Sequence, residues 1–156
     1  MPNWCKVNLD ISSDDSNLIA DFSKALLSEG LFEYFKPNPN GTWQYEWSVQ
    51  NWGVKWDVEG DTIQVVQEDD DRIIVEFDTA WSPPIEFFKH LESLNYNVFA
   101  MYHEEGMAYC GIYANGFDDY YEYGDLLPEE IKATIPKELD YCFSISEQVE
   151  SRLDEP

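Results

Sequence analysis

Residues 3–12 read Asn3-Trp4-Cys5-Lys6-Val7-Asn8-Leu9-Asp10-Ile11-Ser12. Apolar and polar side chains alternate with a period of two, which predicts a β-strand with one buried face. The apolar positions from Cys5 to Ile11 form that face. A strand that is buried on one side needs a covering layer, so the segment that follows decides which class of fold the chain adopts.

The following segment has the pattern of an amphipathic helix over about residues 14–29. Ser12-Ser13-Asp14-Asp15 supplies capping residues and acids where a helix begins. Five apolar side chains then recur at helical spacing: Leu18, Ile19, Phe22, Leu26 and Leu27. Gly30 is a natural stop. The chain therefore begins with a strand and a helix.

The next segment is rich in tryptophan and ambiguous. Residues 36–42 have loop composition, whereas residues 43–52 fit both a strand period and one face of a helix. Periodicity does not decide between these readings. We favour a short helix that ends near Gly53.

Alternation returns after residue 61. It predicts two strands at 63–65 and 73–77, joined by a hairpin tip at 68–71. A helix opened by Ser82-Pro83-Pro84 follows. Two more strands are predicted at 98–102 and 107–113, joined by a turn at 103–106. This βαββαβ order predicts an α+β, ferredoxin-like sandwich with helices on one sheet face, a Trp-rich insertion and an extra strand.

We expect a single domain over 1–156, with a core at about 3–114 and an acidic C-terminal extension at about 115–156. The extension is less regular. A short helix is expected from Pro128, a strand or helix near 140–152, and a frayed end at 152–156.

Charge and aromatic content narrow the function. Nine Lys and Arg stand against 32 Asp and Glu, a formal net charge of −23, and 16 % of the residues are aromatic. Disordered chains lack such aromatics. Scattered basic residues exclude direct binding to nucleic acid, and an anionic membrane surface would repel the chain. Residues 90–131 contain acids but no Lys or Arg.

Three motifs resemble the YubB-like ferredoxin-like domain family of phages, plasmids and mobile elements. They are Met1-Pro2-Asn3-Trp4-Cys5 with Leu9, Asn51-Trp52-Gly53-Val54-Lys55-Trp56-Asp57, and Phe77-Asp78-Thr79-Ala80-Trp81-Ser82-Pro83-Pro84. The resemblance implies a ferredoxin-like fold and a cytoplasmic protein of bacterial or phage origin. It implies little chemistry.

The favoured candidate site is a partner-binding set of acids and tyrosines: Glu104, Glu105, Asp118, Asp119, Tyr120, Tyr121, Glu122 and Asp125. Carboxylates interleaved with aromatic rings can imitate nucleic acid and occupy a basic cleft on another protein. The competing interpretation is a solvated acidic face.

The alternative is a Trp-lined pocket for a small molecule or nucleotide: Asn51, Trp52, Lys55, Trp56, Asp78 and Trp81. The same residues also have a structural interpretation, in which the indole rings pack against the sheet and Lys55 pairs with Asp57 or Asp78. We favour this structural role over a ligand pocket.

No catalytic motif is present, so we expect no enzyme and no cofactor. No metal site is expected, because neither acidic run has calcium-loop spacing. His90 mid-helix and His103 at a hairpin edge are read as incidental. Cys5, Cys110 and Cys142 are read as free thiols of a reducing cytosol, the first two buried.

The hypothesis is a non-enzymatic, cytoplasmic interaction protein of a bacterial host that inhibits a basic defence or nucleic-acid-processing protein. Its oligomeric state is left open.

Overall fold

The computed structural model describes residues 3–154. Six strands form one sheet: β1 (Trp4–Ser12), β2 (Gln64–Glu68), β3 (Arg72–Ala80), β4 (Asn97–Glu104), β5 (Tyr109–Ala114) and β6 (Phe117–Glu122). Seven α-helices and one 3-10 turn accompany them: α1 (Ser16–Ala25), α2 (Leu31–Phe35), α3 (Tyr45–Trp52), η1 (Gly60–Thr62), α4 (Ile85–Ser93), α5 (Pro128–Thr134), α6 (Lys137–Phe143) and α7 (Ile145–Leu153).

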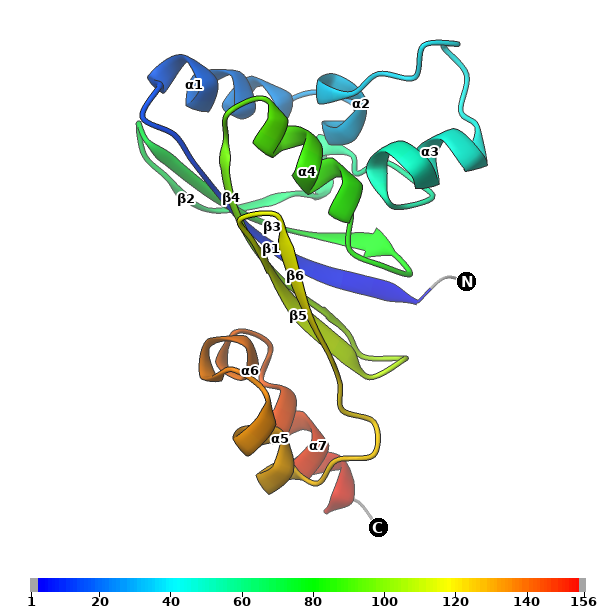
Figure 1. Cartoon of the computed structure of the whole chain (residues 1–156), viewed down its shortest axis with the longest axis vertical. Helices are drawn as coiled ribbons and strands as arrows, with labels where there is room; N and C mark the ends of the chain where they lie inside the picture. The colour runs from blue at the N-terminus through cyan, green and yellow to red at the C-terminus, as the bar shows by residue number, and fades with distance from the viewer. Residues whose placement is uncertain (1–2, 155–156) are drawn as a thin grey trace.

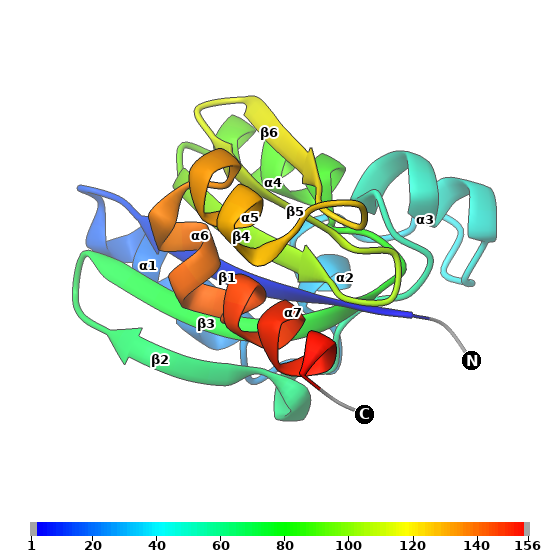
Figure 2. The same ribbon diagram turned by 90° about the horizontal axis from the view of Figure 1, so that it is seen from below.

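The strands are antiparallel in the order β2-β3-β1-β4-β5-β6. β3 and β1 lie in the centre between β2 and β4, and α1 and α4 are the two crossovers, so β1-α1-β2-β3-α4-β4 is a ferredoxin-like unit. The predicted fold class is confirmed. β5 and β6 extend the sheet beyond β4, so β2 and β6 are its two edges (Figure 2).

Helices α1 to α4 cover the first face of the sheet (Figure 1). The alternation at residues 5–11 produces this face as predicted, and its four apolar side chains are buried. Phe22 of α1, Phe32 of α2 and Phe87 of α4 are fully buried against them. This main core includes Trp52, so the Trp-rich insertion completes the first layer.

The second face is covered too, by α5, α6 and α7 (Figures 1 and 2). The expectation of helices on one face is therefore confirmed for the ferredoxin-like core, whereas the C-terminal extension adds three helices on the other face. Cys110, Ile131, Leu139 and Ile145 form a second buried cluster between these helices and the sheet. The acidic extension folds because its few apolar side chains are gathered against the outward side of β4, β5 and β6.

The first helix is shorter than predicted, because α1 ends at Ala25 and Gly30 starts a second helix instead of only stopping the first. The Asp15 side chain caps α1 by accepting from Asn17 N at 2.9 Å. Residues 45–52 are helical, as favoured, and Gly53 ends α3 with a φ of 85°.

Three further local predictions are corrected. Ser82 is not the cap of α4, since α4 begins after Pro84 and the Ser82 hydroxyl donates to the Gly53 carbonyl at 3.2 Å. β4 continues through Glu104 and β5 begins at Tyr109, so the turn comes two residues later than expected. Residues 152–153 belong to α7, while residues 155 and 156 of the expected frayed end lie outside the described residues.

Candidate functional site

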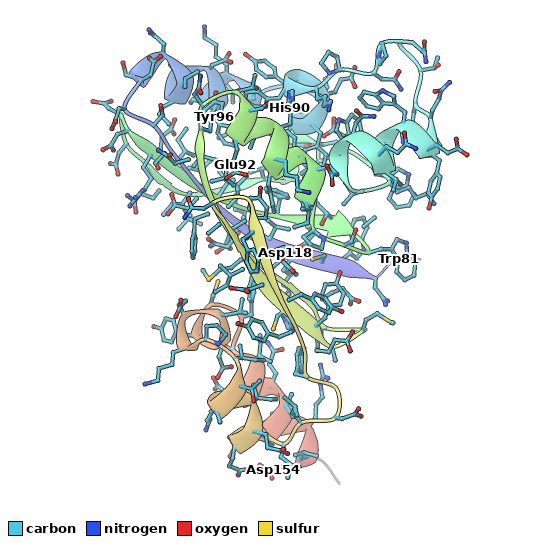
Figure 3. The ribbon with its side chains drawn as sticks, in the orientation of Figure 1. Trp81, His90, Glu92, Tyr96, Asp118 and Asp154 are labelled. Carbon is cyan, nitrogen blue, oxygen red and sulfur yellow. The ribbon has the colours of Figure 1, made fainter. Side chains whose placement is uncertain are left out.

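The base-free stretch 90–131 becomes one continuous side of the molecule. It contains the end of α4, all of β4, β5 and β6, and the start of α5. β4, β5 and β6 are neighbours in the sheet, so the base-free stretch of sequence is also one continuous part of the sheet. The basic side chains beside it come from other segments, such as Lys6 of β1 opposite His103 and Arg152 of α7 at Glu105. Figure 3 shows Glu92 on α4 and Asp118 on β6 within this side. We call it the acidic side.

β6 distributes the predicted acid–tyrosine set over both faces of the sheet. In its pairing with β5, Asp118 lies opposite Tyr113 and Tyr121 lies opposite Cys110. Tyr113 belongs to the first face and Cys110 to the second. Asp118, Tyr120 and Glu122 therefore project on the first face, whereas Asp119 and Tyr121 project on the second. The five members of the set that lie on β6 are therefore presented by one edge strand and not by one flat surface.

Asp118 is fixed by a buried tyrosine. Tyr102 of β4 is fully buried, and its hydroxyl donates to Asp118 Oδ1 at 2.6 Å. The phenol reaches β6 by crossing Gly111, where an added Cβ would lie 2.2 Å from the Tyr102 hydroxyl. Only glycine leaves room for this path. Burial raises the pKa of Asp118, and the hydrogen bond from Tyr102 opposes the rise.

A cleft of about 400 Å³ lies beside β6 on the first face. Tyr102, Tyr109 and Tyr120 line it, and its charged lining residues are Glu86 and Asp118. The Tyr109 and Tyr120 rings are 5.3 Å apart. Carboxylates and phenol rings therefore meet here, as the sequence analysis expected, but the tyrosines of β4 and β5 were missed because their alternation indicated core positions.

Two predicted members of the set have local structural roles. Glu104 is 1 % exposed, and its carboxylate accepts from the backbone N–H groups of Gly106 at 2.6 Å and Met107 at 3.0 Å, so it shapes the β4–β5 turn. Glu105 forms an ion pair with Arg152 of α7. Asp125 is exposed in the loop after β6.

The predicted Trp pocket does not assemble as proposed. Trp52 is 4 % exposed within the main core, and its indole N–H donates to the Lys36 carbonyl at 3.0 Å. Asn51 donates to the Trp47 carbonyl of its own helix. Trp81 lies beyond the end of β3 (Figure 3) with a φ of 70°, and its carbonyl accepts from the Tyr109 hydroxyl. None of these three residues lines the cleft that contains Trp56.

The expected pairing of Lys55 with Asp57 or Asp78 is also wrong. Lys55 Nζ lies 4.5 Å from the centroid of the Trp56 ring. The Asp57 carboxylate instead accepts from three backbone N–H groups, those of Phe32, Glu33 and Val58, at 2.7, 2.9 and 2.7 Å. It caps α2, which is why the chain can start a helix at Leu31.

Trp56 and Asp78 do line one cleft, together with Trp4 of β1. Sequence reasoning missed Trp4, although one signal was available. Trp4 occupies the polar phase of the alternation at residues 3–12, where a large aromatic ring is not needed by the core.

His103 is buried and not at a hairpin edge as predicted. It is 2 % exposed, and its Nε2 lies 2.5 Å from the Tyr123 hydroxyl. Burial, with Lys6 and Arg152 nearby, lowers its pKa to about 4, so the ring is neutral at physiological pH. His90 Nε2 lies 2.9 Å from the Phe35 carbonyl and joins α4 to α2.

The thiols agree with the prediction for the first two cysteines. Cys5 and Cys110 are buried, and burial raises the pKa of each thiol to about 12. Thiolate chemistry at neutral pH is disfavoured at both. Within residues 3–154, no helix is both long and apolar enough to span a bilayer.

Comparison with known proteins identifies one family. A family model described as "Ferredoxin-like domain in Api92-like protein" matches residues 52–133. The match runs from the end of α3 through β2, β3, α4, β4, β5 and β6 into α5. No curated protein and no solved structure matches the chain.

Proposed function

The chain belongs to the family of ferredoxin-like domains found in Api92-like proteins, and from this fold and its charge distribution we propose that it is a binding protein without catalytic activity. Its partner is a basic protein, which it engages with the acidic side. A ferredoxin-like fold serves many unrelated functions, so the proposal is carried by the surface and not by the fold.

The observation that carries it is the segregation of charge. β4, β5 and β6 lie together at one side of the sheet, and their stretch of chain contains no Lys or Arg. Asp118 and Asp119 project to opposite faces of the same edge strand. A partner that approaches the edge of β6 therefore meets carboxylates on both faces and exposed rings such as Tyr120.

The alternation of acids and rings suits a mimic of nucleic acid. Asp118 and Glu122 are four residues apart on one face of β6, about 13 Å, and the Tyr120 ring lies between them. A linear array of fixed charges with interleaved rings presents what a Lys- and Arg-lined cleft recognises. We extend the proposal to a phage or mobile-element protein that blocks a host defence or nucleic-acid-processing protein in the bacterial cytoplasm.

The experiment compares two variants with equal changes in net charge. The edge variant carries Asp119→Lys, Glu122→Lys and Asp125→Lys, and it keeps Asp118 so that Tyr102 retains its hydrogen-bond partner. The tip variant carries Asp69→Lys, Asp70→Lys and Asp71→Lys in the β2–β3 hairpin, a comparably exposed acidic run at the other side of the sheet.

Each immobilised protein is exposed to bacterial lysate at low and high salt, and the captured proteins are identified and tested for displacement by double-stranded DNA. The proposal predicts a DNA-displaceable partner that the wild type and the tip variant retain at low salt and the edge variant loses. Equal loss in both variants would mean that net charge alone is responsible. If the wild type captures no partner that DNA displaces, the proposal is wrong.

A further inference from the structure

A second concave site lies at the N-terminal end of β1, away from the tyrosine cleft. Its walls are the indoles of Trp4 and Trp56, whose ring centroids are 6.4 Å apart with an angle of 39° between the planes. The cleft has a volume of about 330 Å³. Trp4 is 49 % exposed and Trp56 is 38 % exposed, so neither ring is accounted for by the core. We call this site the tryptophan cleft.

The lining of the tryptophan cleft is acidic. Its charged residues are Asp57, Glu59 and Asp78, and its lining includes no Lys, Arg or His. The Asp57 carboxylate is occupied by the backbone of α2. Within the described residues, no group donates a hydrogen bond to the Glu59 or Asp78 carboxylates and neither forms an ion pair. These two charges are therefore available to a ligand.

Phosphate-bearing ligands are disfavoured by this lining. A nucleotide would place its phosphates beside three carboxylates, with no Lys, Arg or His among the lining residues. Lys6 lies opposite Asp78 in the β1–β3 register and lines a neighbouring cleft together with it, and Lys55 lies over the Trp56 ring, so both ammonium groups flank this cleft without lining it. The lining therefore disfavours a nucleotide in this cleft.

Indole faces and carboxylates together attract organic cations. The face of an indole carries negative electrostatic potential, and rings arranged around a carboxylate recognise alkylated ammonium groups. The chain already uses Trp56 in this way, since Lys55 Nζ sits over that ring at 4.5 Å. We propose that the tryptophan cleft binds an alkylated ammonium group at the mouth of the wedge formed by Trp4 and Trp56, with Asp78 as its counter-charge.

The ring geometry favours a compact group over a flat one. A planar group that stacks between two rings needs a ring separation of about 7 Å, because it makes a contact of about 3.5 Å with each ring. The Trp4 and Trp56 ring centroids are closer than this and the ring planes are tilted, so a planar group does not fit between them. A tetrahedral trimethylammonium head at the mouth of the wedge contacts both rings without intercalating. The group can belong to a free molecule such as choline or to a methylated lysine of a protein.

The test uses the indole N–H signals in ¹H–¹⁵N NMR spectra, with the Trp4 and Trp56 signals assigned from Trp4→Phe and Trp56→Leu. The wild-type chain is titrated with choline, with its uncharged isostere 3,3-dimethylbutanol, and with AMP. Choline is expected to shift the Trp4 and Trp56 signals saturably. The isostere tests whether the positive charge is required, and AMP tests the exclusion of anions.

Trp56→Leu is expected to weaken choline binding about two- to fivefold, the strength of one exposed cation–π contact. Asp78→Asn is expected to weaken it as well, while Asp125→Asn, which changes the net charge equally, leaves it unchanged. If Trp56→Leu fails to fold, Trp4→Phe and Asp78→Asn carry the test. A trimethyllysine peptide that binds more tightly than choline identifies a protein ligand, and equal affinity identifies a free one.

The proposal is overturned if choline leaves both signals unmoved at tens of millimolar, if dimethylbutanol shifts them equally, or if Asp125→Asn weakens binding as much as Asp78→Asn. None of these results tests the proposal for the acidic side, because the three positions of the edge variant, Asp119, Glu122 and Asp125, do not line the tryptophan cleft.

Discussion

The hydrogen bond from Tyr102 to Asp118 should both stabilise the protein and hold the acidic strand in place. Tyr102→Phe removes a single oxygen, the donor to Asp118 Oδ1 at 2.6 Å. Hydrogen bonds to charged groups contribute about 1.5 to 3 kcal/mol, and the lower value applies because Asp118 is partly exposed. We expect a loss of about 1.5 kcal/mol in the free energy of unfolding, which lowers Tm by about 3 to 6 °C for a chain of this size.

The same substitution should raise the pKa of the Asp118 carboxyl. Burial raises that pKa and the Tyr102 hydrogen bond lowers it, so loss of the bond leaves burial less opposed. Urea unfolding measures the stability, and ¹³C NMR titration of the carboxyl measures the pKa. Tyr109→Phe is the matched control, because the Tyr109 hydroxyl donates to the Trp81 carbonyl and not to Asp118.

The reasoning is refuted if Tyr102→Phe leaves both the unfolding free energy and the Asp118 pKa unchanged. It is also refuted if Tyr109→Phe shifts the Asp118 pKa by as much as Tyr102→Phe does.

Three further outcomes are expected. His103 has a folded pKa near 4 against 6.5 in the unfolded chain, so the unfolded chain binds more protons between these two pH values. Its contribution to stability therefore falls by about 2.5 kcal/mol between pH 6.5 and 4, and urea unfolding across pH should show this slope reduced in His103→Phe. Asp57→Asn weakens the cap of α2 by about 1 to 2 kcal/mol, measured by thermal unfolding, and an unchanged Tm would contradict that role. Iodoacetamide should label Cys142, which is partly exposed, well before the buried Cys110, and equal rates by mass spectrometry would contradict the packing of the second cluster.

Strands with one buried face were predictable, because a period of two survives in any half-buried strand. β1 follows this rule along its whole length, and β3 follows it as far as Thr79. β6 does not, since its side chains are exposed or half-exposed on both faces. An edge strand held by pairing with β5 leaves no apolar alternation in the sequence. α2 was missed for a different reason: its cap is Asp57, distant in the sequence.

The candidate sites also have one part that local sequence could predict and one part that depends on contacts between distant segments. Local composition identified the acid and tyrosine content of β6, because charge is a property of the sequence itself. It could not place Asp118 and Asp119 on opposite faces without the strand assignment. Trp56 and Asp78 meet Trp4 only through the pairing of β1 with β3 and the path of the insertion, which are tertiary facts. The predicted pocket included Trp52 because this residue is close to Lys55 and Trp56 in the sequence, whereas in the structure its ring is part of the main core.

The most direct test of the central claim is the salt dependence of affinity between the chain and its DNA-displaceable partner. Calorimetry would be run at several NaCl concentrations on the wild type, the tip variant and the edge variant. We expect the affinity of the wild type and the tip variant to fall steeply with salt, and the edge variant to bind weakly with a shallow salt dependence. Identical salt slopes and affinities for all three proteins would contradict it.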